Sequence, residues 1–188
     1  MLLPFSPPKD YLETMVSVRQ AKEQDATAIA HVHVQSWRTT YAGIVPDDYL
    51  ASLKEAERVL LWQDWLTRDI HVYVAERDGE LVGFLCGGRI REPSPGYDAE
   101  LFAIYLLDRA QGQGLGTALL RKLSEALAAE GFKGMIVWVL EQNPAVRFYE
   151  KSGASLVSAK QIEIGGVLLQ EVALAWPDLA KLASPLYR

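Results

Sequence analysis

Residues 100–117 read ELFAIYLLDRAQGQGLGT, and this stretch decides the fold that we expect. It begins with an apolar run of strand length, 100–107, and continues into the glycine-rich segment 111–117. Beyond the glycines, leucines recur every four residues from 115 to 127, which is the apolar stripe of an amphipathic helix. The stretch therefore predicts a strand, a tight glycine turn and the first turn of a helix.

The glycine turn predicts a site for a phosphate or a pyrophosphate. Glycines allow successive main-chain N–H groups to point at one spot, and the positive end of the helix dipole attracts an anion. A glycine-rich turn without a ligand is the alternative. A nucleotide P-loop is excluded because the loop has no lysine, and a dinucleotide fingerprint is excluded because Thr117 stands where a third glycine is required.

The sequence after this stretch predicts a second strand and a second helix. Residues 135–140 are apolar throughout, as in a strand buried on both faces. Asn143 and Pro144 suit the start of a helix, and Gly153 suits its end. A strand, helix, strand and helix in this order indicate a parallel strand pair joined by a right-handed crossover. A hairpin of 161–164 and 167–176 is expected to follow.

The sequence before residue 100 predicts a mixture of strands and helices. A short strand at 16–18 precedes a helix that runs to Trp37, and two short helices are expected after Pro46. Asp78-Gly79 suits the tight turn of a hairpin between 72–75 and 81–85. The prolines and glycine of 91–97 predict a loop before the next strand.

Composition indicates one soluble domain in a reducing compartment. The 188 residues, 49% of them hydrophobic, suffice for a single core, and we expect an N-terminal extension at 1–14, a domain at 15–177 and a C-terminal tail at 178–188. A net charge of −5 argues against a nucleic-acid partner. The single cysteine, Cys86, favours a buried thiol. The proline-broken N-terminus predicts neither a signal peptide nor a membrane span, so a cytoplasmic location is expected.

Two motifs resemble the GNAT superfamily of N-acetyltransferases. That family's signature is Arg or Gln, two residues, Gly, one residue, and Gly or Ala, and it is matched by Gln111, Gly114 and Gly116. The strand 100–106 looks like the one that precedes the signature, and 143–153, NPAVRFYEKSG, looks like the second cofactor motif. Gln113 departs from the Lys or Arg that members often carry. The resemblance extends over about residues 16 to 176.

The resemblance implies an α/β (α+β) fold and acetyl-CoA as the acyl donor. The fold is a mixed, mostly antiparallel sheet of about seven strands with a splayed parallel pair, flanked by about four helices. The pantetheine arm would lie between the parallel strands, and the pyrophosphate would lie on the amides of 111–117. The cofactor-binding residues implied in this way are Ile104, Leu106, Gln111, Gly112, Gln113, Gly114, Leu115, Gly116, Thr117, Asn143, Phe148 and Tyr149.

The activity implied is transfer of the acetyl group to a primary amine of an unidentified acceptor, either a small molecule or a protein. A non-catalytic acetyl-CoA-binding sensor or docking module is the alternative. An amine with a lysine-like pKa is mostly protonated at neutral pH, so a base is useful. Glu100 matches a position that the family often uses as the base, and an exposed strand-end carboxylate is its other interpretation. Tyr149 matches the phenol that protonates the departing thiolate, in preference to a plain core aromatic.

The remaining expectations concern the acceptor and other partners. Asn143 suits a helix cap as well as a contact to pantetheine. Trp37, Tyr41 and Tyr49 are candidates for lining the acceptor pocket or for the core. His31 and His33 lie on different helix faces, so we expect no metal site. A homodimer through the last hairpin remains open, and no membrane partner is expected.

Overall fold

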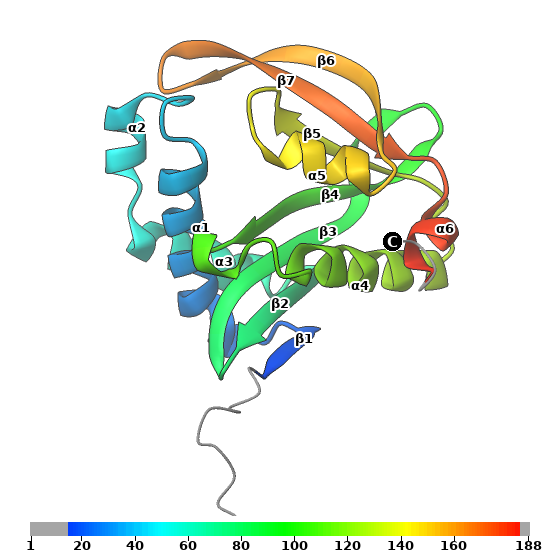
Figure 1. The fold of residues 1–188 in the computed structure, drawn as a ribbon, viewed down its shortest axis with the longest axis horizontal. Coiled ribbons are helices and arrows are strands. Elements are labelled where there is room, and N and C mark those ends of the chain that lie inside the picture. The colour runs from blue at the N-terminus through cyan, green and yellow to red at the C-terminus, as the bar shows by residue number, and fades with distance from the viewer. Residues whose placement is uncertain (1–14, 185–188) are drawn as a thin grey trace, which may run out of the picture.

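The computed structural model describes residues 15–184, so the N-terminal extension predicted at 1–14 lies outside the described residues. The described chain forms one sheet of seven strands in the order β1-β2-β3-β4-β5-β7-β6 (Figure 1). The strands are β1 (Val16–Gln20), β2 (His71–Arg77), β3 (Glu80–Ser94), β4 (Tyr97–Leu106), β5 (Met135–Leu140), β6 (Ser155–Ile164) and β7 (Val167–Trp176). The helices are α1 (Ala26–Thr40), α2 (Asp47–Ser52), α3 (Glu55–Trp65), α4 (Leu115–Ala129), α5 (Ala145–Lys151) and α6 (Leu179–Ala183).

The expected fold class is confirmed by the strand pairing. Every neighbouring pair of strands is antiparallel except β4 and β5, which are parallel and are joined through α4. The leucine stripe of α4 is fully buried against one face of the sheet. The opposite face is covered by α1 and α3, where Trp62 packs on Phe84 (Figure 1). Burial of both faces of the central strands explains their continuous apolar runs.

The turns predicted from glycines are present. Asp78 and Gly79 both have positive φ angles between β2 and β3, and Gly165 and Gly166 do the same between β6 and β7. The segment after Pro46 forms two short helices, α2 and α3, as expected.

The loop predicted for 91–97 is wrong. β3 continues to Ser94, and β4 begins at Tyr97 after a two-residue turn in which Gly96 has a φ of 88°. Pro93 is tolerated because the register between the strands jumps from Arg89 paired with Ala99 to Ser94 paired with Tyr97. A proline without an N–H group can stand in that irregular stretch.

The segment expected as a tail begins with packed structure. Asp178 caps α6 by accepting a hydrogen bond from the Lys181 amide. Leu179 and Leu182 of α6 are buried with the leucines of α4. The packed domain thus extends beyond residue 177.

The parallel pair β4 and β5 is joined over only part of its length. Pairing covers Ala99 with Met135, Glu100 with Ile136 and Leu101 with Val137, and then it stops. β4 runs on to Leu106 and β5 to Leu140 with no further pairing between them. A register shift against β3 leaves Phe102 without a partner at the point where the two strands separate. The sheet therefore has a gap between two central strands.

Candidate active site

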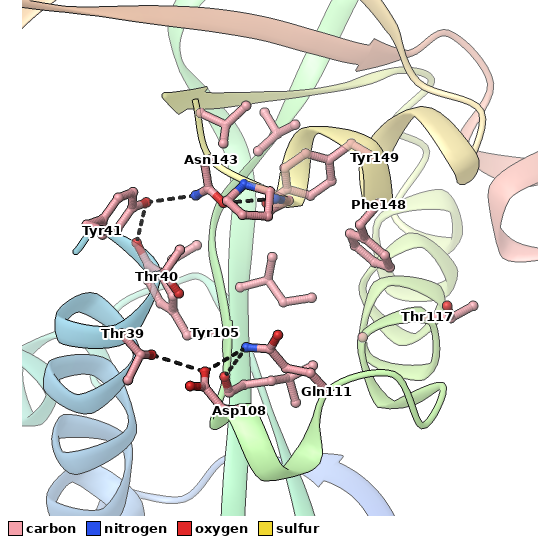
Figure 2. A pocket seen from close by; sticks show the side chains of 18 of the residues that line it. Thr39, Thr40, Tyr41, Tyr105, Asp108, Gln111, Thr117, Asn143, Phe148 and Tyr149 are labelled. Atoms are coloured by element: carbon pink, nitrogen blue, oxygen red, sulfur yellow. Dashed lines mark hydrogen bonds between the residues drawn. The ribbon is translucent and has the colours of Figure 1, made fainter. Parts of the chain in front are cut away.

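A pocket of about 670 Å³ occupies this gap and continues to the start of α4. Its walls come from the end of α1, the separated halves of β4 and β5, the glycine loop and the start of α5 (Figure 2). The pocket thus brings together residues from distant parts of the chain. A cavity of this size is in the range of small-ligand and cofactor sites.

The glycine loop presents unused main-chain donors to the pocket. Gly112 and Gly114 have φ angles of 71° and 81°, and a Cβ on either would meet no atom within 4 Å. Within 15–184, none of the N–H groups of 112–117 has a hydrogen-bond acceptor. The main-chain N–H of Gln111 is different, because it already donates to the main-chain carbonyl of Asp108. The loop and the first turn of α4 thus have the chemistry of an anion site.

The loop is tied to α1 through polar side chains. Thr39 Oγ1 donates to Asp108 Oδ1 at 3.1 Å, and Gln111 Nε2 donates to the same oxygen at 3.3 Å (Figure 2). Gln111 Nε2 also donates to the Leu106 carbonyl at 3.1 Å. The glutamine of the signature therefore fixes the loop against the end of β4 in addition to any contact with a ligand.

Tyr149 of α5 lines the pocket (Figure 2). Its ring is buried against Phe148 and Trp176. Among the described residues, no group forms a hydrogen bond with this hydroxyl. Burial, and to a smaller extent the nearby Tyr41, raise the pKa of the Tyr149 phenol well above its usual value, so the phenol keeps its proton at neutral pH.

Asn143 connects α5 to two tyrosines across the gap. Its Oδ1 accepts from the Ala145 amide at 2.8 Å, which is the cap expected at the start of this helix. Its Nδ2 donates to the Tyr41 hydroxyl at 3.2 Å, and that hydroxyl lies 3.4 Å from the hydroxyl of Tyr105 (Figure 2). Tyr105 stacks on His33, whose pKa is lowered to about 4 by burial. The pocket wall is thus a chain of neutral hydrogen-bonding groups.

Glu100 is neither exposed nor free. It retains 3% of its accessible surface and does not line the pocket. Arg91 holds its carboxylate with the guanidinium group and, through its main-chain N–H, with a further bond of 3.1 Å. Both carboxylate oxygens are therefore engaged on the face of the sheet opposite α4.

The structure brings most of the predicted site residues together. The pocket is lined by Ile104, Leu106, Gln111, Gly112, Gly114, Gly116, Thr117, Asn143, Phe148, Tyr149 and Tyr41. The Leu115 side chain is in the core and the Gln113 side chain donates to the Arg109 carbonyl, so these two residues face the site with their main-chain N–H groups alone. Trp37 and Tyr49 stand behind Tyr41, with ring centroids of Trp37 at 4.7 Å from Tyr41 and 6.2 Å from Tyr49.

Sequence reasoning missed Tyr105, Asp108, Thr39 and Trp138, which also line the pocket. The alternation of β4 points Tyr105 away from the face of Ile104 and Leu106. Tyr105, on the opposite face of β4, lines the same pocket as Ile104 and Leu106 because β5 has separated from β4 and left the gap open to both faces. The one sequence signal that could have identified Tyr105 is its place in the strand before the glycine loop.

Comparison with known proteins agrees with this geometry. The model of the "Acetyltransferase (GNAT) family" matches residues 33–154, which include both halves of the gap and the glycine loop. The chain belongs to the GNAT family of acetyltransferases. It is accordingly an acyltransferase, and the GNAT fold explains the splayed parallel pair.

Similar GNAT proteins are known from several organisms. The uncharacterized N-acetyltransferase YuaI of Bacillus subtilis is 48% identical over 174 residues, which are 93% of this chain and 100% of that protein. The PaiA N-acetyltransferase of Thermoplasma acidophilum, solved in complex with coenzyme A, is 22% identical with a TM-score of 0.64, covering 84% of this chain and 98% of that chain. YncA, a putative acetyltransferase of Salmonella typhimurium solved with acetyl-CoA, is 22% identical with a TM-score of 0.66, covering 90% and 97% of the two chains.

Proposed function

We propose that this GNAT protein transfers the acetyl group of acetyl-CoA to a primary amine of a small molecule or a protein. The proposal rests on two structural features that lie next to each other, an anion site and a gap in the sheet. Unpaired amides at the start of α4 adjoin a gap between two central strands. The amides suit a pyrophosphate, and the gap suits an extended arm that adds main-chain hydrogen bonds like an extra strand.

The cofactor is proposed to lie along β4. The amides of 112–117 hold the pyrophosphate, and the backbone around Ile104 and Leu106 holds the pantetheine. Phe148 lies beside the first turn of α4, where a Cβ added to Gly116 would be 3.4 Å from its ring. Recognition by main-chain groups explains why the loop itself contains no Lys or Arg between 111 and 117.

The reaction requires attack of a neutral amine on a thioester carbonyl and departure of a thiolate. Tyr149 is proposed to donate its proton, or a strong hydrogen bond, to the departing sulfur. Its raised pKa keeps the phenol protonated through the working pH range, so the donor is present before each turnover. Asn143 holds α5 and Tyr41 in place around it. Glu100 was expected as the base, but Arg91 engages both of its carboxylate oxygens and its side chain does not line the pocket.

The test is release of free thiol from acetyl-CoA over a panel of primary amines. Tyr149→Phe is expected to lower turnover by about 10- to 100-fold while acetyl-CoA affinity changes less than twofold, since only a proton donor is removed. Tyr73→Phe is the matched control, because Tyr73 is a half-buried phenol of β2 outside the pocket. Equal turnover in Tyr149→Phe and the wild type would remove Tyr149 from the mechanism.

The same experiment separates this function from a cofactor sensor. Calorimetry that shows acetyl-CoA binding, without thiol release on any amine, would support the non-catalytic alternative. Absence of acetyl-CoA binding would contradict both.

A further inference from the structure

A second carboxylate, that of Glu171, does not itself line the pocket but lies on the strand next to β5, whose Trp138 and Val139 do. Glu171 of β7 is the register partner of Leu140 at the end of β5 and of Lys160 on β6. Leu140 and Leu169 pack with Tyr41, so their face of the sheet is the one that α1 and α2 cover. Glu171 is on this face as well, since residues two apart in a strand point the same way. The turn between β6 and β7 reaches α2 on this face, where Gly165 lies close to Tyr49.

The surroundings of Glu171 already hold a primary ammonium group. Lys160 Nζ lies 4.0 Å from the centroid of the Trp138 ring and 3.8 Å from a carboxylate oxygen of Glu171. Trp138 is part of the pocket wall. An aromatic face beside a carboxylate is a favourable environment for an ammonium group. The chain's own lysine thus shows which chemistry this part of the acceptor side accommodates.

The topology puts the reacting end of the cofactor near this place. The anion site is at the carboxyl end of β4, and the strands close up again at Leu101 and Val137. An arm that enters from the glycine loop therefore has its far end beside Phe102 and Trp138. That end carries the thioester. An amine that enters from the α1 and α2 side meets it beside Trp138, whose ring Lys160 contacts.

We propose that Glu171 is the general base of the acetyl transfer and that the Glu100–Arg91 pair is structural. This inference rests on the proposed function. The acceptor ammonium gives one proton to Glu171, and its nitrogen then attacks the carbonyl carbon. A C–N bond forms and the C–S bond breaks, with its electron pair leaving on sulfur. The sulfur receives a proton from Tyr149, which is reprotonated by the second proton of the nitrogen, and Glu171 releases its proton to water.

The charges that face Glu171 suit this role. They are those of Lys160 on β6, Arg91 and Glu92 on β3 and Glu100 on β4, and the neutral phenol of Tyr41 after α1 is the remaining titratable group. Burial raises the pKa of Glu171 above its usual value, while Lys160 and Arg91 oppose that shift. A higher pKa makes the carboxylate a better proton acceptor. The positive charge of Lys160 next to an incoming ammonium also favours loss of the ammonium's proton.

The test compares three substitutions in the full-length protein, Glu171→Gln, Glu92→Gln and Glu100→Gln. The probes are putrescine, lysine and a tetrapeptide with a free N-terminus, and the best of them is carried forward. Glu171→Gln is expected to lower kcat/KM for the amine about 100-fold at pH 7, with acetyl-CoA affinity by calorimetry unchanged within twofold. Glu92→Gln is the matched control, because Glu92 is equally close to Lys160 at 3.8 Å but its side chain is 81% exposed, against 16% for Glu171.

The pH profile decides between a base and a structural role. The ratio of wild-type to Glu171→Gln activity should shrink as the pH approaches the pKa of the amine, because free amine then no longer needs a base. Glu171→Asp should keep the wild-type shape of the profile at a lower rate. Parallel profiles for the wild type and Glu171→Gln, or a loss of activity confined to a folded Glu100→Gln, would overturn the inference. If the wild type releases no thiol with any amine, the proposed function itself fails.

Discussion

The glycine at position 114 allows a prediction in which two similar substitutions have opposite signs. Gly114 stands before α4 with φ of 81° and ψ of −5°. An alanine in this left-handed conformation costs about 1–2 kcal/mol, and the smaller freedom of the unfolded chain returns about 0.4–1 kcal/mol. No steric cost is added, because nothing lies within 4 Å of the new Cβ. Gly114→Ala is therefore expected to destabilise the fold by about 1 kcal/mol net.

Gly116→Ala is the matched control within the same loop and helix. Gly116 is in the first turn of α4 without a positive φ, and its Cβ would make ordinary contacts of 3.4–3.5 Å with Phe148 and Leu106. Alanine is preferred to glycine in a helix by about 0.5–1 kcal/mol, so this variant should be slightly more stable. The GNAT signature also accepts alanine at this position.

Urea unfolding and thermal melting measure the two stabilities. Gly114→Ala should lower Tm by about 2–4 °C, and Gly116→Ala should not lower it. Calorimetry with acetyl-CoA should show affinity reduced about fivefold for Gly114→Ala, because relief of the strain turns the amides at the start of α4 away from their common direction. A Gly114→Ala protein as stable as the wild type and equal in affinity would refute the reasoning.

Three further predictions concern buried groups. Burial lowers the pKa of His33 from 6.5 to about 4 in the folded protein. Between these two pH values the unfolded chain binds a proton at His33 that the folded protein does not. The free energy of unfolding should therefore fall as the pH drops from about 6.5 to 4, by up to ~3 kcal/mol. His33→Gln should flatten this dependence in urea titrations at several pH values. Burial also raises the pKa of Cys86 to about 12, so native protein should not react with a disulfide reagent that reacts fully in urea, and the thiol-release assay should have no protein background. Arg91→Met should destabilise the protein by about 3 kcal/mol or more, because it leaves the buried Glu100 carboxylate uncompensated, and Arg91→Met combined with Glu100→Gln should recover part of the loss in urea unfolding.

Each of these predictions has a contradicting result. A pH dependence identical in His33→Gln and the wild type would assign the acid loss to other groups, with Asp25 the first to examine, since Arg19 lowers its pKa and its contribution is lost as the pH falls. Rapid labelling of native Cys86 would show that the strand around it opens easily. Wild-type stability of Arg91→Met would show that the ion pair adds nothing to the fold.

Much of the fold followed from local patterns along the chain. Residues 135–140 form β5 with the predicted bounds, and Asp78-Gly79 and Gly165-Gly166 make the predicted turns. Local steric rules act on neighbouring residues, so they can be read without knowledge of the rest of the chain. The loop predicted at 91–97 failed because pairing across the irregular register keeps a proline-containing segment extended.

The placement of the site residues shows which of them local sequence patterns can reveal. The glycine signature, Asn143 and Tyr149 were found because motif residues lie close together along the chain. Tyr105 and Trp138 were missed as pocket residues because only the separation of β4 from β5 exposes them to the gap. Lys160 was missed because only the fold of the last hairpin brings it to Trp138. Glu100 was read as free because no local pattern reveals that Arg91 covers it.

The sequence by itself determined the glycine turn, the helix that follows it and the strands on either side, because these depend on backbone sterics and on the period of apolar residues. Only the tertiary structure decided that Arg91 holds the buried Glu100 and that Glu171 stands beside Lys160. That outcome depends on contacts between β3, β4, β6 and β7. The charge and burial of a carboxylate are set by groups far away in the sequence, and these come together only when the sheet forms.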